Sequence, residues 1–273
     1  MGILVSDPST ALSPLTVTLS TLASRQGLAD PLIVTDLEGW IPAADLVSGA
    51  ALPDLFAVAE RRWDAAPHAA ATLAWKSYTY WLALPVVLSW ATNRRVPLVD
   101  PQHMVVRFDT GSPLLQIGFS KLKLAVPTDD SLARTPEALG HDDNVSIVGH
   151  DDGVSIVGDD KLLLKVMRVS LLDHHLEPLA ERIHERVKVG KHNLRGSIAS
   201  GIAYGVIRAG RSLPGPPERT ISTVLKALGL EDLVELLPSV EGNAGPGVQR
   251  KTCCLAFTLP EPKICSGCCL RKG

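Results

Sequence analysis

The chain has 273 residues, of which 45% are hydrophobic, and its 27 basic and 29 acidic side chains give a formal net charge of −2. This length suits one large domain with at most a small appendage, and the apolar content is sufficient for a sizeable core. The nearly balanced charge provides no general positive field, so we expect no nucleic-acid partner.

The first part of the chain predicts helices separated by loops. Residues 11–25 predict a first helix, because Ser13-Pro14 resembles an N-cap followed by proline at the first helical position. Residues 27–53 contain three prolines and predict loops with short elements. Residues 55–63 predict a short helix.

Residues 69–91 predict a strong helix and are the candidate for a membrane span. Lys76 and Pro85 interrupt the apolar run, which is shorter than the roughly 20 residues that a span requires. We therefore expect a buried core helix kinked near Pro85, and no membrane span. Five tryptophans lie within residues 40–90. We interpret them as core residues, and the lining of an apolar pocket for a bulky ligand is the alternative.

The middle of the chain predicts strands. Residues 104–108 and 114–119 predict two strands joined by a turn, and residues 161–169 predict another strand. A tandem nonapeptide, HDDNVSIVG followed by HDDGVSIVG, occupies residues 141–158. Calcium-binding repeats of this length need several copies and a richer glycine pattern. We therefore interpret residues 139–160 as a duplicated surface insert, in which each Val-Ser-Ile-Val forms part of an exposed ladder.

The region from 171 to 210 predicts helices. An apolar stripe recurs at spacings of three and four: Leu172, Leu176, Leu179, Ile183 and Val187. We interpret His174, His175 and His184 as surface or capping residues. The next helix carries Arg195, Arg208 and Arg211, which are either solvated charges or a basic rim near a metal site.

Breaks in the chain then precede its C-terminal part. Residues 211–217 form a link rich in proline and glycine, residues 218–229 predict an amphipathic helix, and residues 241–247 predict a second loop. These two breaks indicate that the C-terminal part folds back on the body of the protein.

All five cysteines lie in the last 21 residues: Cys253, Cys254, Cys265, Cys268 and Cys269. Four of them follow the pattern C-C-x10-C-x2-C, and four thiolates in one short segment can hold an iron–sulfur cluster or a zinc ion. Disulfides are the alternative, but the count is odd and every possible loop is short. The N-terminus shows no secretory signal, so we expect a reducing cytosol, where thiolates more often bind metal.

Zinc competes with an iron–sulfur cluster for these thiolates. Zinc sites usually take two C-x2-4-C turns, and this segment has one, Cys265 to Cys268, in which Gly267 suits a turn because glycine accepts positive φ. The other half is the adjacent pair Cys253-Cys254, whose side chains would point to opposite faces of an extended strand. A two-iron cluster is wider than one zinc ion, which favours iron–sulfur on chemistry alone.

The C-terminal C-C-x10-C-x2-C motif resembles the signature of the FhuF-like ferric-siderophore reductases. The stretch from His175 to Leu179, continuing through 193–199, is similar to that family's helical region, whereas residues 1–100 show no specific similarity. The resemblance implies a [2Fe–2S] cluster, with these ligands: Cys253, Cys254, Cys265 and Cys268. Cys269 departs from the family's pattern, and we interpret it as a free thiol.

The expected fold is α+β: a helix-rich single domain with a central small antiparallel sheet and a cysteine-rich C-terminal tail. Residues 1–247 would form the body, with a surface for siderophore docking, and residues 248–273 the iron–sulfur segment. The expected function is cytoplasmic one-electron reduction of a ferric siderophore, with contact at the inner face of the membrane left open. A zinc-stabilised binding module and an iron–sulfur sensor or scaffold are the alternatives.

No glycine-rich nucleotide fingerprint follows a strand in this chain. The electrons are therefore expected from a partner protein, such as a ferredoxin or a flavoprotein reductase. The expected chemistry involves no acid–base residue, so no catalytic side chain is assigned.

Overall fold

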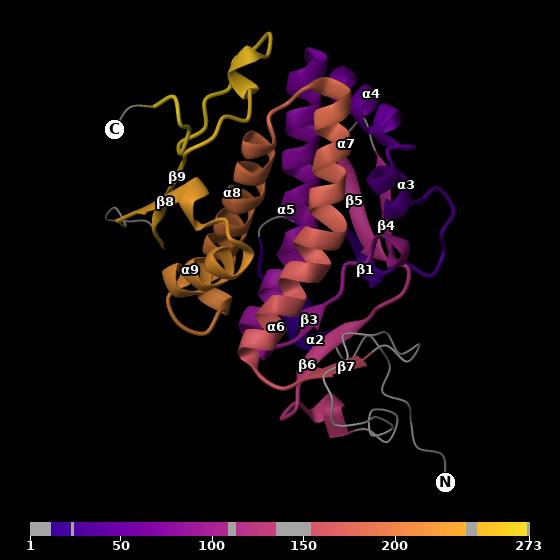
Figure 1. Ribbon diagram of the computed structural model, residues 1–273, viewed down its shortest axis with the longest axis vertical. Coiled ribbons are helices and arrows are strands. Elements are labelled where there is room, and N and C mark those ends of the chain that lie inside the picture. Colours follow the sequence, from indigo (N-terminus) through magenta and orange to yellow (C-terminus); the bar gives the residue numbers. More distant parts are fainter. Residues whose placement is uncertain (1–11, 23–24, 109–112, 135–153, 239–244, 272–273) are drawn as a thin grey trace.

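The computed structural model describes residues 12–22, 25–108, 113–134, 154–238 and 245–271. Helix α5 (Pro67–Asn93) runs through the middle of the molecule beside α8 (Lys191–Ala209), as Figure 1 shows. Small residues bring the two helices close together: Gly201 lies against the backbone of Tyr80, and Gly205 against Leu84. The buried Trp75 indole donates a hydrogen bond to the Leu194 carbonyl at 2.8 Å. The α5–α8 pair is thus the rigid centre of the fold.

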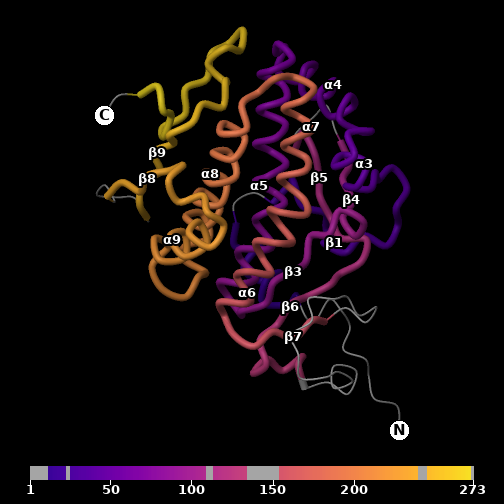
Figure 2. Tube along the Cα trace, viewed as in Figure 1, coloured from indigo at the N-terminus to yellow at the C-terminus, as the bar shows by residue number. Residues whose placement is uncertain are grey.

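Shorter helices surround this centre. Helices α2 (Ser13–Ser20), α3 (Ala43–Ser48) and α4 (Leu52–Trp63) come from the N-terminal part of the described chain. Helix α6 (Asp160–Met167) leads through the π-helix η4 (Arg168–Leu176) into α7 (Glu177–Val187), and the three form one long rod in Figures 1 and 2. Helix α9 (Pro217–Leu228) packs against α8.

The described residues also form three small sheets. One has the strand order β1 (Leu28–Ile33), β5 (Leu115–Phe119), β4 (Met104–Phe108), β2 (Ile41–Pro42). Another has the order β3 (Val96–Pro97), β6 (Leu124–Pro127), β7 (Val154–Val157). A hairpin of β8 (Val234–Leu237) and β9 (Gly247–Arg250) lies on the C-terminal side. The β1–β5 and β6–β7 pairs are parallel, and the others are antiparallel.

The α+β class predicted from the sequence is confirmed, and so are several of its elements. The strands at 104–108 and 114–119 form the antiparallel β4–β5 pair. The predicted helices at 55–63, 69–91 and 218–229 correspond to α4, α5 and α9. Helix α5 continues through the buried Pro85. None of the helices in the described residues combines the length and the apolarity that crossing a bilayer requires.

The tryptophans belong mainly to the core. Trp75 and Trp81 are buried in the main cluster, and Trp63 and Trp90 pack against it while partly exposed. Trp40 packs against a small separate cluster formed by Ala29, Val34 and Val105.

The predicted strand at 161–169 is wrong, because this segment forms α6 and the start of η4. The Asp159 carboxylate caps the helix by accepting a hydrogen bond from the Leu162 N–H at 2.8 Å. Leu163, Val166 and Met167 are buried at helical spacing. A short apolar run of this kind does not distinguish a strand from a buried helix by its pattern alone.

The interpretation of His175 as a surface or capping residue is also wrong, because its side chain is 0% exposed. Its ring shares hydrogen bonds of 2.6 Å with the Tyr78 hydroxyl and with the Val99 carbonyl. Burial lowers the pKa of His175 to about 4, against the opposing effects of the Val99 carbonyl and of Asp100. His174 is exposed, and His184 bonds to the Val189 carbonyl at the end of α7.

The duplicated nonapeptide falls largely outside the described residues. Its second Val-Ser-Ile-Val is β7, a half-buried strand that pairs in parallel with β6. This copy therefore belongs to a sheet of the body and not to a separate exposed ladder.

Deleting either copy of the nonapeptide is predicted to preserve the fold. Removal of 141–149 or of 150–158 leaves one Val-Ser-Ile-Val followed by Asp159-Asp160, so the remaining copy can pair with β6. Deleting both copies removes the strand and is expected to lower the melting temperature. Thermal unfolding of the three deletions checks this, and an equal loss in a single deletion and in the double deletion would contradict it.

The buried His175 is predicted to make the protein less stable in acid. In the unfolded chain its imidazole binds a proton near the ordinary histidine pKa of 6.5, whereas in the folded chain it does so only near a pKa of about 4. The free energy of unfolding should therefore fall as the pH drops from about 6.5 to 4, by roughly 3 kcal/mol from this group. Denaturant unfolding across this range checks the slope, which His175→Gln should reduce. An unchanged slope in this variant would contradict the assignment.

Candidate metal centre

The segment that carries the cysteines, residues 251–271, is fastened to the body through β9. Arg250 donates its backbone N–H to the Gly267 carbonyl at 2.9 Å, and Lys251 donates to the Leu233 carbonyl at 3.1 Å. The Gln249 side-chain amide donates to the Cys268 carbonyl at 2.9 Å. The segment lies along α8, on the other side of the central helices from the β1–β5–β4–β2 sheet (Figure 1). The predicted folding back of the C-terminal part is therefore observed, and the predicted domain boundary at 247 falls inside β9.

The two groups of cysteines each stand at a bend of the chain. Cys265 to Cys268 form a turn closed by the Cys268 N–H and the Cys265 carbonyl at 3.1 Å. Leu255, directly after Cys254, has a φ of 59°, and its N–H donates to the Cys253 sulfur at 3.3 Å. The adjacent pair is therefore followed directly by a bend at Leu255 and is not part of a strand. The argument against zinc assumed an extended strand at this pair, and the absence of that strand weakens it.

The five thiols share one neighbourhood. Burial raises the pKa of the Cys265 thiol, and the side chains of Cys254 and Cys268 act on it in the same direction. Burial likewise raises the pKa of Cys269 to about 11, and Cys269 interacts directly with Cys253 and Cys268. Cys254 and Cys268 are buried, whereas the other three thiols are partly exposed. The bends thus bring together two groups of cysteines that are separated by ten residues in the sequence.

The donor set consists of cysteines, and this kind of side chain fits a metal bound by thiolates. Within the described residues, however, no group of three or more histidine, cysteine, aspartate or glutamate side chains is arranged to hold a metal ion. The thiols are close neighbours whose sulfurs do not converge on a single point. Cysteine sulfur is the ligand that both zinc and iron–sulfur clusters prefer.

Positive side chains face the thiols. Lys76, from α5, and Arg250, from β9, both lower the pKa of Cys265 against the effect of burial. Tyr204, from α8, lies beside the turn, and its hydroxyl donates to the Val248 carbonyl at 3.3 Å. Burial is the main cause that raises the pKa of Tyr204, and the charge of Cys265 raises it further. Sequence reasoning missed these roles. The one visible signal was Lys76, a charge within an otherwise apolar helix.

The arginines that the sequence offered as a basic rim have other partners. Arg195 pairs with Glu177 at 3.1 Å, and Arg208 stacks on the Tyr80 ring and donates to its hydroxyl. Arg211 is exposed. The basic side chains that act on Cys265 are instead Lys76 and Arg250.

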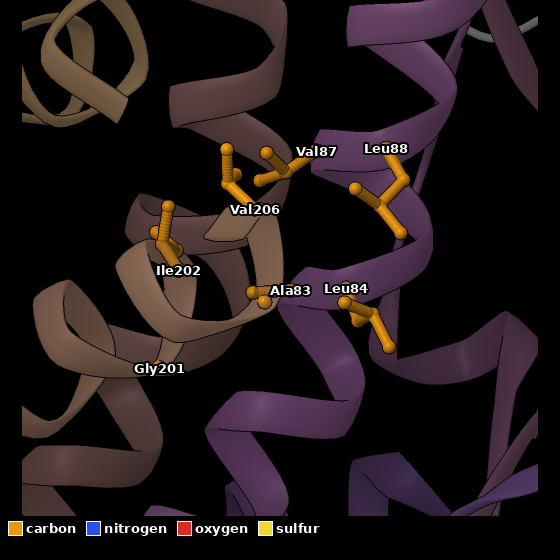
Figure 3. Close-up of a pocket in the computed structure, with 8 residues that line it drawn as sticks. Ala83, Leu84, Val87, Leu88, Gly201, Ile202 and Val206 are labelled. Carbon is orange, nitrogen blue, oxygen red and sulfur yellow. The ribbon is translucent and has the colours of Figure 1, made fainter. Parts of the chain in front are cut away.

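A depression between α5 and α8 does not resemble a siderophore site. It is lined by Ala83, Leu84, Val87, Leu88, Gly201, Ile202, Gly205 and Val206, and no tryptophan is among them (Figure 3). Its empty space is about 160 Å³, open solvent included, which is below the roughly 300–1,000 Å³ of typical ligand pockets. The depression also lacks the polar groups that orient a ligand.

No protein-family model and no curated protein matches this chain. The similarity to the FhuF-like reductases therefore depends on the cysteine spacing and on the short stretches described above.

Gly267 is predicted to be essential to the turn. The reason is the close packing around it, and not the positive φ that the sequence suggested. Its φ is not positive, but an added Cβ would overlap the Val248 carbonyl and crowd the Tyr204 hydroxyl. We expect Gly267→Ala to lower the free energy of unfolding by about 1–3 kcal/mol and to reduce the metal content. Gly158→Ala, whose Cβ would meet Leu162 at an ordinary 3.7 Å, is the control. Equal stability of the two variants in denaturant would contradict this packing.

Proposed function

We propose that Cys253, Cys254, Cys265 and Cys268 hold a [2Fe–2S] cluster and that the protein reduces ferric siderophores. The neighbourhood of the thiols carries this proposal, because residues far apart in the segment come together. Their spacing, similar to that of the FhuF-like reductases, favours iron–sulfur over zinc. When bound, such a cluster supplies electrons one at a time.

The chain's own residues hold the thiols at an edge of the molecule. Cys254 and Cys268 are buried, whereas Cys253 and Cys265 are partly exposed, so the site is covered on one side and reachable from the other. Helix α8 supports it, because Gly196 lets this helix approach Thr252 directly. A rigid and partly exposed position is what electron transfer to a docked chelate requires, because its rate falls with distance.

The substrate would dock on the surface around this edge. Three large apolar side chains of the segment are exposed: Phe257 by 40%, Ile264 by 50% and Leu270 by 52%. Lys251, Lys263 and Arg271 are exposed on the same segment. Apolar and basic groups together suit a bulky chelate that presents oxygen ligands around its iron.

The reaction on the substrate needs no acid–base residue. One electron converts Fe(III) in the chelate to Fe(II), which is larger and softer and which hard oxygen donors hold less tightly. Reduction therefore releases the metal without breaking a covalent bond of the siderophore. An electron-donor protein, such as a ferredoxin or a flavoprotein reductase, would supply the electron, and we propose the cytoplasm as the compartment.

Turnover with a trap for Fe(II) tests the function. The dithionite-reduced protein, mixed with a ferric siderophore, should be reoxidised and release about one Fe(II) per cluster, consistent with one-electron chemistry. Cys268→Ser should reduce this rate at least tenfold, because it removes a proposed ligand, whereas Cys269→Ser should retain it. Hydroxamate and catecholate chelates should react at different rates.

Two results would count against this function. Equal rates with every chelate, ferric citrate included, would indicate unspecific electron leakage and favour a sensor or scaffold. A colourless protein that holds zinc would favour the zinc-stabilised binding module. The bend at Leu255 independently supports this alternative.

A further inference from the structure

Arg250 carries a buried charge that the described part of the protein leaves largely unpaired. Its side chain is 2% exposed, and Nη2 donates to the Ser197 hydroxyl at 3.1 Å. Nε and Nη1 are buried and have no hydrogen-bond partner among the described residues. A guanidinium keeps its charge throughout the physiological pH range and offers five N–H donors. Most of this donor capacity is therefore unused.

Other arginines of the protein pair with carboxylates. Arg94 contacts Asp129 and Asp160, and the mostly buried Arg95 contacts Asp130 through two of its nitrogens. No ion pair between Arg250 and a carboxylate occurs within the described residues. Burying a charge without a partner is unfavourable, so buried charges are normally paired or lie near metal sites. An anion beside the guanidinium would therefore compensate the buried charge of Arg250.

Thiols, which become anionic when they bind a metal, lie near Arg250. Its backbone N–H bonds to Gly267 inside the Cys265–Cys268 turn, and the chain reaches Cys253 three residues further on. Ser197, which accepts from the guanidinium, follows Gly196 on α8, and Gly196 lies directly against Thr252, the residue before Cys253. The Thr252 hydroxyl is likewise buried without a hydrogen-bond partner in the described residues. The unused donors therefore lie close to the chain that leads into the cysteine site.

We propose that Arg250 is the buried counter-cation of the metal-loaded cysteine site. Four thiolates around two ferric ions and two sulfides give a net charge of about −2, and four thiolates around Zn²⁺ give the same value. This inference rests on the proposed function only in that the four cysteines bind a metal. It depends neither on the identity of that metal nor on the substrate.

The consequence is that Arg250 favours the loaded form over the empty one. In the empty form its charge lies buried without a carboxylate partner among the described residues, which is unfavourable. In the loaded form the anionic site compensates it. With a redox-active metal the site gains a further negative charge on reduction, so Arg250 would also favour the reduced state.

Thermal unfolding of the full chain, with and without metal, tests this role. We expect Arg250→Met to leave the melting temperature of the metal-free protein unchanged or raised, and to lower that of the loaded protein. The difference between the two temperatures should therefore shrink, and a competing chelator should remove the metal at least tenfold more readily. In an iron-loaded protein the reduction equilibrium should also shift roughly tenfold towards the oxidised form, about 59 mV for one electron.

Matched variants separate this role from a structural one. Ser197→Ala removes a hydrogen bond of Arg250 but keeps its charge, so the difference between the two melting temperatures should persist. Arg182→Met, which removes an exposed arginine paired with Glu185, should change neither temperature. A parallel fall of both temperatures in Arg250→Met would show that Arg250 only supports the fold, and would overturn the proposal.

Failure of the variants to fold, and the metal content of the wild-type chain, also test the role of Arg250. If Arg250→Met and Arg250→Gln both fail to fold without metal, the proposal is wrong, because it expects no harm to the empty form. A wild-type chain that binds zinc and reduces no siderophore would end the proposed function, while the Arg250 comparison would stay valid. A wild-type chain that takes up neither zinc nor iron would overturn both.

Discussion

The cysteine site depends on one backbone hydrogen bond, from the Arg250 N–H to the Gly267 carbonyl. This bond closes the loop between β9 and the Cys265–Cys268 turn, and it brings two groups of cysteines to one place. Closing such a loop costs conformational entropy, which grows slowly with loop length. The β8–β9 pairing, the bond from Gln249 to Cys268 and the contact of Tyr204 with Val248 offset this cost.

The helical core determines which groups surround the thiols. Helix α8 contributes Ser197 and Tyr204, and its Gly196 allows the segment to approach its backbone. Helix α5 contributes Lys76. Because α5 and α8 pack on each other through small residues, these groups are held in a fixed relation. The result is a thiol site with positive side chains and one exposed edge.

Much of the fold could be predicted from local patterns, and the exceptions have physical causes. Helix α5 and the β4–β5 pair follow from length and alternation. The prediction for the segment 161–169 is wrong because its apolar run suits a strand or a buried helix equally well, and the cap at Asp159 decides the matter. His175 appeared as one of several histidines on a helix, whereas its burial depends on Tyr78 and Val99, which are distant in the sequence.

In the candidate site, too, local patterns could be predicted from the sequence, whereas contacts between distant residues could not. The cysteine spacing could be predicted to bring thiols together, because it is a local pattern. The burial of Arg250 could not be predicted from the sequence, since it arises from the contact of β9 with α8. Gly267 was recognised as important, but for its conformational freedom, whereas its real constraint is the close approach of Val248.

The identity of the bound metal is the most direct test of this account. Iron, acid-labile sulfide and zinc can be measured in the full-length protein purified without oxygen, together with its visible spectrum. The account predicts about two iron and two sulfide per chain and a red-brown protein with absorption bands typical of iron–sulfur clusters. A colourless protein with about one zinc per chain and no sulfide would contradict it.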